Sequence, residues 1–174
     1  MRFTVTTDWK DNRPLKLVLA WFLVFVALLW VTNALLYFAK MGLTPDSVIA
    51  YYRGDEERFL QPRSYLGLLE VTHFHLLAMG ILVLTMTHLL LFVPMPSRWK
   101  AWGVSLSFGS ALADEAAGWL VRFVAPGFAY LKIGAFLTLE ATLAFLVGAV
   151  LWALASAQPN TYRSGACSED DNDG

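Results

Sequence analysis

Long apolar blocks separated by short polar connections make up most of this chain. Four blocks stand out, at about residues 17–39, 65–93, 101–124 and 130–155. Each is long enough to cross roughly 30 Å of hydrocarbon, which takes about 20 helical residues. Their apolar residues run continuously and do not alternate with polar ones, which favours membrane helices over strands. The pattern therefore predicts an all-α integral membrane protein, a four-helix bundle with four spans.

The third block is the most polar of the four. It contains Asp114 and Glu115, together with three glycines that lower its helix propensity. The connections on either side of it are short and leave little room for a different arrangement. We therefore interpret this block as a span as well.

A short additional helix is predicted in the first outer loop, at about residues 41–64. Thr44 followed by Pro45 matches an N-cap residue with proline at the first helical position. Apolar positions alternate there with charged ones, which favours a helix lying at the membrane interface. A capped loop without a function of its own accounts for this segment equally well.

The domain organisation follows from these blocks. Residues 1–156 are expected to form one membrane domain, and residues 157–174 a disordered acidic tail with almost no apolar content. The single cysteine, Cys167, lies in this tail. One cysteine excludes an intramolecular disulfide framework and a Cys-rich metal centre within the chain.

Composition agrees with a membrane location. Hydrophobic residues make up 57% of the chain and charged residues 16%, whereas soluble domains carry about 25% charged residues. The lipid bilayer is thus an expected partner, and a net charge of -1 gives no reason to expect nucleic acid. The sequence has no P-loop, GxSxG, dinucleotide-binding or HExxH motif, so we do not expect a free-standing enzyme.

Basic residues favour one orientation in the membrane. Those before the first span and between the second and third are Arg2, Lys10, Arg13, Lys16, Arg98 and Lys100. With four spans, the positive-inside rule then places both termini and that connection in the cytoplasm. The prediction is a multi-pass protein of the cell inner (plasma) membrane.

Polar groups inside the predicted spans gather at one depth. They lie about five to ten residues from the outer ends of the spans, which at 1.5 Å per residue is the outer half of the bilayer. They are Asn33, Glu70, His73, His75, Asp114, Glu115 and Glu140. Because unpaired charges are costly in hydrocarbon, we expect these groups to satisfy one another, hold a metal ion or relay protons. A hydrogen-bonded layer that only fixes helix register accounts for the same pattern.

One motif in this layer points to metal chemistry. Glu70 and His73 are three residues apart, which places a carboxylate and an imidazole on one helix face. Di-iron bundles use two such motifs and two further glutamates, whereas this chain has one motif. A non-haem metal ion such as zinc, iron or copper suits the remaining donors. The other candidate ligands are His75, Asp114, Glu115 and Glu140.

His88 adds a second kind of candidate site. It lies 15 residues after His73 and 13 after His75, roughly 20 Å further along the helix. Histidines near opposite ends of one span resemble those on the haem-bearing helices of b-type membrane cytochromes. The resemblance implies haem b bound through His73 or His75 and through His88, with electron transfer to a periplasmic redox partner. No other block contains a histidine, so a homodimer or another subunit of a membrane complex has to supply the second ligand, unless one axial histidine suffices.

Beyond this helix, the chain resembles the small four-helix bacterial inner-membrane proteins of unassigned activity. Three functions stay open on the sequence. The first is a haem-binding electron-transfer subunit, and the second is a metal-binding or proton- and ion-handling membrane protein built on the outer Glu/His/Asp cluster. The third is a structural subunit of a larger membrane complex.

Overall fold

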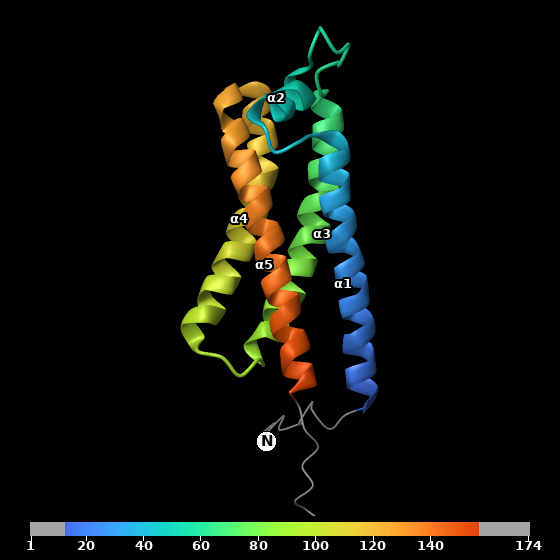
Figure 1. Cartoon of the computed structure of the whole chain (residues 1–174), viewed down its shortest axis with the longest axis vertical. Coiled ribbons are helices and arrows are strands. Elements are labelled where there is room, and N and C mark those ends of the chain that lie inside the picture. The colour runs from blue at the N-terminus through green and yellow to red at the C-terminus, as the bar shows by residue number, and fades with distance from the viewer. Residues whose placement is uncertain (1–12, 157–174) are drawn as a thin grey trace, which may run out of the picture.

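The computed structural model describes residues 13–156, which form five α-helices and one 3₁₀ turn (Figure 1). No strand occurs in this part of the chain, which confirms the all-α prediction. The segment before residue 13 and the predicted acidic tail (157–174) lie outside the described residues. The elements are α1 (Arg13–Lys40), α2 (Pro45–Arg53), α3 (Tyr65–Leu91), α4 (Ser97–Phe123), η1 (Pro126–Phe128) and α5 (Ala129–Ala155).

Three of the described helices are long and apolar enough to cross a membrane. They are α1, α3 and the stretch Pro126–Ala155, which joins η1 to α5. The fourth long helix, α4, has the same length as α3 but is more polar than the other three. The charged residues along α4 are Arg98, Lys100, Asp114, Glu115 and Arg122.

The four long helices run alongside one another, and α2 lies across one end of them (Figure 1). We call this the α2 end. α5 packs against α1, α3 and α4, and its most extensive contact is with α4. α1 packs against the rest of the protein mainly through α5.

Buried apolar side chains form two clusters at different heights. The larger cluster includes Leu23, Val26, Leu82, Met86, Leu90, Leu139, Leu143, Leu146 and Val150. The smaller cluster lies at the α2 end and contains Tyr37, Met41, Val48, Tyr52, Leu68, Val121, Ala129 and Phe136. Most of the polar groups described below lie between these two clusters.

α2 begins and ends where local chemistry dictates. Thr44 has the extended conformation of an N-cap, and Pro45 is the first helical residue, where its missing N–H costs no hydrogen bond. The helix ends at Arg53, and the C-cap residue Gly54 has a φ of 86°, which suits a residue without a side chain. The prediction of a short helix in this loop is confirmed.

α2 is fastened to the end of α4 by packing and by one hydrogen bond. Tyr52 is buried against Gly118, where an added Cβ would lie 2.9 Å from the tyrosine hydroxyl oxygen. Arg53 Nε donates to the carbonyl oxygen of Val121 at 2.8 Å. This bond satisfies a carbonyl in the last turn of α4, where no further helical partner follows.

Replacing Gly54 with alanine should destabilise the turn that follows α2. An added Cβ would lie 2.7 Å from the Leu60 carbonyl oxygen and 2.9 Å from the Pro62 nitrogen. Strained backbone conformations of this kind cost about 1–3 kcal/mol. Thermal unfolding in detergent should therefore start at a lower temperature than for the parent protein. The matched change Gly127→Ala has open space around it and negative φ, so equal effects of the two substitutions would contradict this explanation.

Candidate functional site

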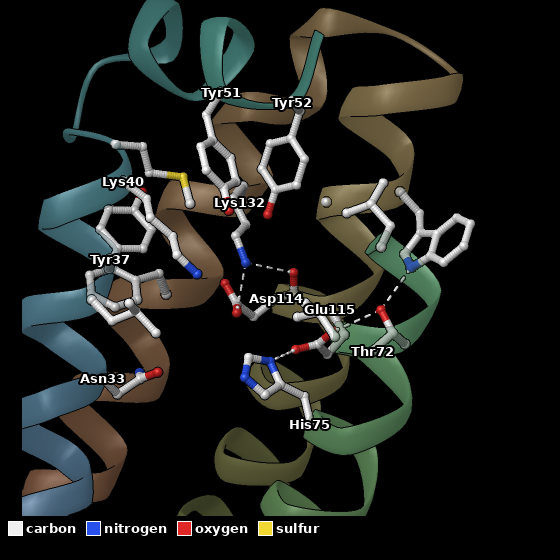
Figure 2. Close-up of a pocket in the computed structure, with 17 residues that line it drawn as sticks. Asn33, Tyr37, Lys40, Tyr51, Tyr52, Thr72, His75, Asp114, Glu115 and Lys132 are labelled. Carbon is white, nitrogen blue, oxygen red and sulfur yellow. Dashed lines mark hydrogen bonds and ion pairs between the residues drawn. The ribbon is translucent and has the colours of Figure 1, made fainter. Parts of the chain in front are cut away.

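A polar pocket lies beneath α2 and is lined by all five helices (Figure 2). Its volume is about 80 Å³, enough for a few water molecules or a small polar group, since one water needs about 10–15 Å³ of such space. Its polar lining residues are Asn33, Tyr37, Lys40, Tyr51, Tyr52, Thr72, His75, Asp114, Glu115 and Lys132.

An ion pair joins α4 to α5 inside this pocket. Lys132 Nζ lies 2.8 Å from Asp114 Oδ2 and also donates to the Asp114 carbonyl oxygen at 3.1 Å (Figure 2). The side chains of Lys132 and Asp114 are only 9% and 16% exposed. Asp114 Oδ1 is buried and has no hydrogen-bond partner in the described part of the chain. This oxygen is therefore an acceptor that the pocket offers to a proton or to a bound polar group.

A second pair joins α3 to α4 directly beside the first. His75 Nδ1 lies 2.6 Å from Glu115 Oε1 (Figure 2). The other carboxylate oxygen, Oε2, accepts a hydrogen bond from Thr72 Oγ1 at 3.2 Å, and Trp119 Nε1 donates to Thr72 Oγ1 at 2.9 Å. The carboxylate of Glu115 is thus held from two sides, which fixes its position against the imidazole.

These contacts determine which ring nitrogen of His75 is available. When Glu115 is ionised, its carboxylate only accepts hydrogen bonds, and Nδ1 of His75 is then the donor in this contact. Figure 2 shows the other ring nitrogen, Nε2, pointing away from Glu115 towards the α1 side of the pocket. The His75 side chain is 44% exposed, so Nε2 is accessible to a proton from the pocket.

The α2 side of the pocket supplies a tyrosine hydroxyl group. Tyr52 descends from α2 towards Asp114 and Lys132 (Figure 2). Burial raises the pKa of the Tyr52 hydroxyl above its usual value, and the nearby Asp114 carboxylate raises it further. The hydroxyl therefore stays protonated and can donate a hydrogen bond to an anion or to a water molecule in the pocket.

Glu140 is satisfied separately. Its Oε1 accepts a hydrogen bond from Asn33 Nδ2 at 2.8 Å, which ties α1 to α5. Asn33 lines the pocket and Glu140 does not. Glu140 was predicted to act as a metal ligand together with Asp114 or Glu115. The structure does not bring these carboxylates together, because each contacts a different partner.

The structure does not place Glu70, His73 or His88 in the pocket. All three are exposed on α3, where the His73 ring contacts Phe74 and the His88 ring contacts Phe92. Helical geometry explains why His73 and His75 face different sides of α3, because the directions of side chains two residues apart differ by about 200°. His75 faces the bundle, so His73 faces outward, and Glu70 shares that outer face.

The described residues contain no group of three or more His, Cys, Asp or Glu side chains arranged to hold a metal ion. The six predicted metal ligands separate into distinct environments. Asp114 contacts Lys132, Glu115 contacts His75, and Glu140 contacts Asn33, while the other two lie on the outer face of α3. The charge of Asp114 is already balanced by the Lys132 ammonium.

Two side chains near the pocket have partners that were not predicted from the sequence. Lys132 lies near the start of the fourth apolar block and is not among the polar groups predicted to gather at one depth, whereas its side chain reaches the buried Asp114. Arg122 lies on the same helix as Asp114 and Glu115, but its Nε donates to the carbonyl oxygen of Arg63 at 2.8 Å. The position of Lys132 near the end of a predicted span could have revealed this contact, because a long side chain near a helix end can reach several residues further along the helix.

Comparison with known proteins identifies the type of domain. No curated protein and no solved structure matches the chain. Residues 42–161 match a family, Aq_1264_TM, that is described as a transmembrane helical domain. The matched region covers α2 to α5 and hence both pairs, Lys132 with Asp114 and His75 with Glu115. Because it covers more than half of the chain, this protein belongs to the Aq_1264_TM family of transmembrane helical domains.

Proposed function

We propose that this protein handles protons in the membrane and that His75, held by Glu115, is its exchangeable group. The observation that carries the proposal is the 2.6 Å contact between these side chains in a pocket that also contains the Lys132–Asp114 pair. Histidine is the side chain whose charge changes most readily near neutral pH. Uptake of a proton at Nε2 converts the contact into an imidazolium–carboxylate pair.

The neighbouring groups make this uptake tolerable inside a membrane. An isolated imidazolium would be costly in hydrocarbon, but Glu115 already lies against the ring as its counter-ion. The charge of Asp114, the residue that precedes Glu115, is balanced by Lys132. These two pairs therefore change their net charge by one while each charged group in them keeps a partner.

The closed floor of the pocket favours a binding site over a pore. The large apolar cluster lies on the side away from α2, and Met86, Leu143 and Leu146 in it are at most 2% exposed. Among the described residues, no ionisable side chain is buried in that cluster. Protons would therefore enter and leave by the α2 end, as in a sensor or a proton-binding subunit that transmits its charge state to a partner.

We further propose that α4 crosses the membrane together with α1, α3 and α5, as a four-helix bundle in the cell inner membrane. The support is that the two acidic residues in the middle of α4 are paired internally, with Lys132 and with His75. Its 27 residues extend about 40 Å, enough to cross the hydrocarbon. The positive-inside rule then places the termini in the cytoplasm and the pocket in the outer half of the bilayer.

Infrared difference spectra of the reconstituted protein, recorded between acidic and alkaline buffer, test the proton-handling proposal. Protonation of His75 should shift the carboxylate stretch of Glu115, because the two groups are in direct contact. The shift should be absent in Glu115→Gln and in His75→Gln. It should persist in the matched control Glu70→Gln, because Glu70 is exposed on the outer face of α3. A shift that survives both pocket substitutions would overturn the proposal.

A haem-binding role is the second candidate, and one observation favours it. His73 and His88 are both exposed on α3, so a partner chain could approach them. Within one chain the fit fails, since no second histidine lies opposite either of them in the described structure and His75 is held by Glu115. A homodimer or a partner subunit would have to supply the other axial imidazole.

The visible absorption spectrum of the purified protein tests the haem-binding role. The protein should be purified with haem supplied during expression and examined before and after reduction. Sharp reduced α and β bands that disappear in His88→Ala would support haem ligation and electron transfer. A colourless protein would contradict it.

A further inference from the structure

A second concavity adjoins the polar pocket at the α2 end. It is formed by the C-terminal end of α1, by α2 and by the segment that follows α2, and its volume is about 630 Å³. That is within the range of small-molecule sites, about 300–1,000 Å³. It shares Lys40, Met41 and Tyr51 with the polar pocket. We call this concavity the outer groove.

The lining of the outer groove is cationic. Lys40, Arg58 and Arg63 line it, and no carboxylate does. Arg58 forms an ion pair with Asp55 at 3.3 Å, whereas no ion pair to Lys40 or Arg63 occurs among the described residues. Two positive charges are therefore left uncompensated in a concave surface, which concentrates anions.

The other basic residues at this end already have structural partners. Arg53 donates to the Val121 carbonyl oxygen, and Arg122 donates to the Arg63 carbonyl oxygen. These two side chains hold backbone segments together. Arg63 and Lys40 have no ion-pair partner among the described residues, and Figure 2 shows the Lys40 ammonium in the polar pocket that adjoins the groove.

Arg63 is held in place for such a role. Its backbone N–H donates to the Tyr52 carbonyl oxygen at 3.1 Å, and its carbonyl oxygen accepts from Arg122 Nε at 2.8 Å. Its guanidinium lies over the ring of Tyr51, 4.2 Å from the ring centroid. Stacking fixes the guanidinium plane and leaves its edge N–H groups for a bidentate acceptor.

The segment that contributes Arg58, Leu60 and Arg63 to the groove is also fixed. Asp55 and Leu60 exchange two backbone hydrogen bonds, at 3.0 Å and 2.9 Å. Asp55 Oδ1 also accepts from the backbone N–H groups of Glu57 and Arg58. The groove is therefore pre-organised, and a ligand that binds there loses little affinity to ordering of the loop.

We propose that the outer groove binds a phosphate group, with Arg63 as the bidentate contact and Lys40 as the second charge. Planar guanidinium and compact ammonium groups are the side chains that recognise phosphate. The groove lies at the ends of α1 and α3, where lipid headgroups meet a bundle of this kind. The phosphate could belong to an anionic lipid or to a soluble molecule. This inference goes beyond the proton-handling proposal, because it depends on different residues and a different readout.

The test uses the full chain in lipid nanodiscs and has two arms. In the first, native mass spectrometry counts the phosphatidylglycerol molecules retained from nanodiscs that mix it with phosphatidylcholine. In the second, calorimetry measures binding of inorganic phosphate to the protein in nanodiscs of phosphatidylcholine alone. Retention of phosphatidylglycerol without phosphate binding identifies a lipid ligand, and binding of inorganic phosphate identifies a soluble one.

Matched variants make either arm decisive. Arg63→Gln and Lys40→Gln should each weaken binding about tenfold or more, the usual effect of losing a hydrogen bond to a charged group. The control is Arg98→Gln, since Arg98 also stacks on an aromatic ring, 5.8 Å from the centroid of Trp99, but at the opposite end of α4. Circular dichroism spectra with the helical content of the parent protein verify that each variant is folded. Absence of binding in both arms, or equal losses in the control, would overturn the proposal.

Discussion

Replacing Lys132 with methionine should destabilise the folded protein by about 3–5 kcal/mol, the usual cost of removing one partner from a buried ion pair. Lys132 is the only side chain that forms an ion pair with Asp114 in the described structure. Methionine has a similar length and no charge, so the substitution removes the interaction with little change in packing. Asp114 would then be left buried with an uncompensated charge. Equilibrium unfolding in mixed detergent micelles measures this loss.

The double variant Lys132→Met with Asp114→Leu separates the ion pair from the packing around it. Replacing both members of a buried pair with apolar residues is often neutral or stabilising. The double variant should therefore recover most of the stability that Lys132→Met loses. If Lys132→Met alone were as stable as the parent protein, the pair would not be buried in the way the structure shows.

Replacing Leu146 with alanine should cost about 2–5 kcal/mol, the range for a truncated leucine in a packed core. Leu146 is fully buried in the large apolar cluster, beneath the polar pocket. Its removal leaves a cavity in the region that closes the pocket from the far side of the bundle. The same unfolding experiment in micelles measures the loss.

The control for Leu146→Ala is on the same helix. Leu137 is 46% exposed on α5, so Leu137→Ala should change stability by less than about 0.5 kcal/mol. Because the two substitutions delete the same atoms from one helix, differences in helix propensity cancel. Similar losses for both variants would mean that α5 does not bury Leu146 against its neighbours.

Much of the secondary structure could be predicted from the sequence. Long apolar blocks give long helices because a continuous apolar surface has no other stable arrangement in a bilayer. The short helix α2 was signalled by Thr44 and Pro45, which act locally through backbone geometry. Whether α4 crosses the membrane was harder to predict, because its hydropathy does not reveal that its charged groups are paired inside the bundle.

The candidate site was less predictable, for a geometric reason. Depth along a helix can be counted from the sequence, and it brought His75, Asp114 and Glu115 to one level. Rotation about the helix axis depends on how the helices pack, and packing turned Glu70 and His73 away from the pocket. Contacts between side chains from distant segments also leave no local pattern in the sequence. The Lys132–Asp114 contact and the hydrogen bond from Trp119 to Thr72 are of this kind.

The most direct test of the central claim is a nitrogen-15 NMR titration of the histidines in the reconstituted protein, assigned with His73→Gln, His75→Gln and His88→Gln. We expect Nδ1 of His75 to stay protonated across the titration, because it donates to Glu115, and Nε2 to gain and lose the proton. In Glu115→Gln the preference for the Nδ1-protonated form should disappear. A His75 ring that keeps one protonation state at every pH, or that is unaffected by Glu115→Gln, would contradict the claim that this pair handles protons.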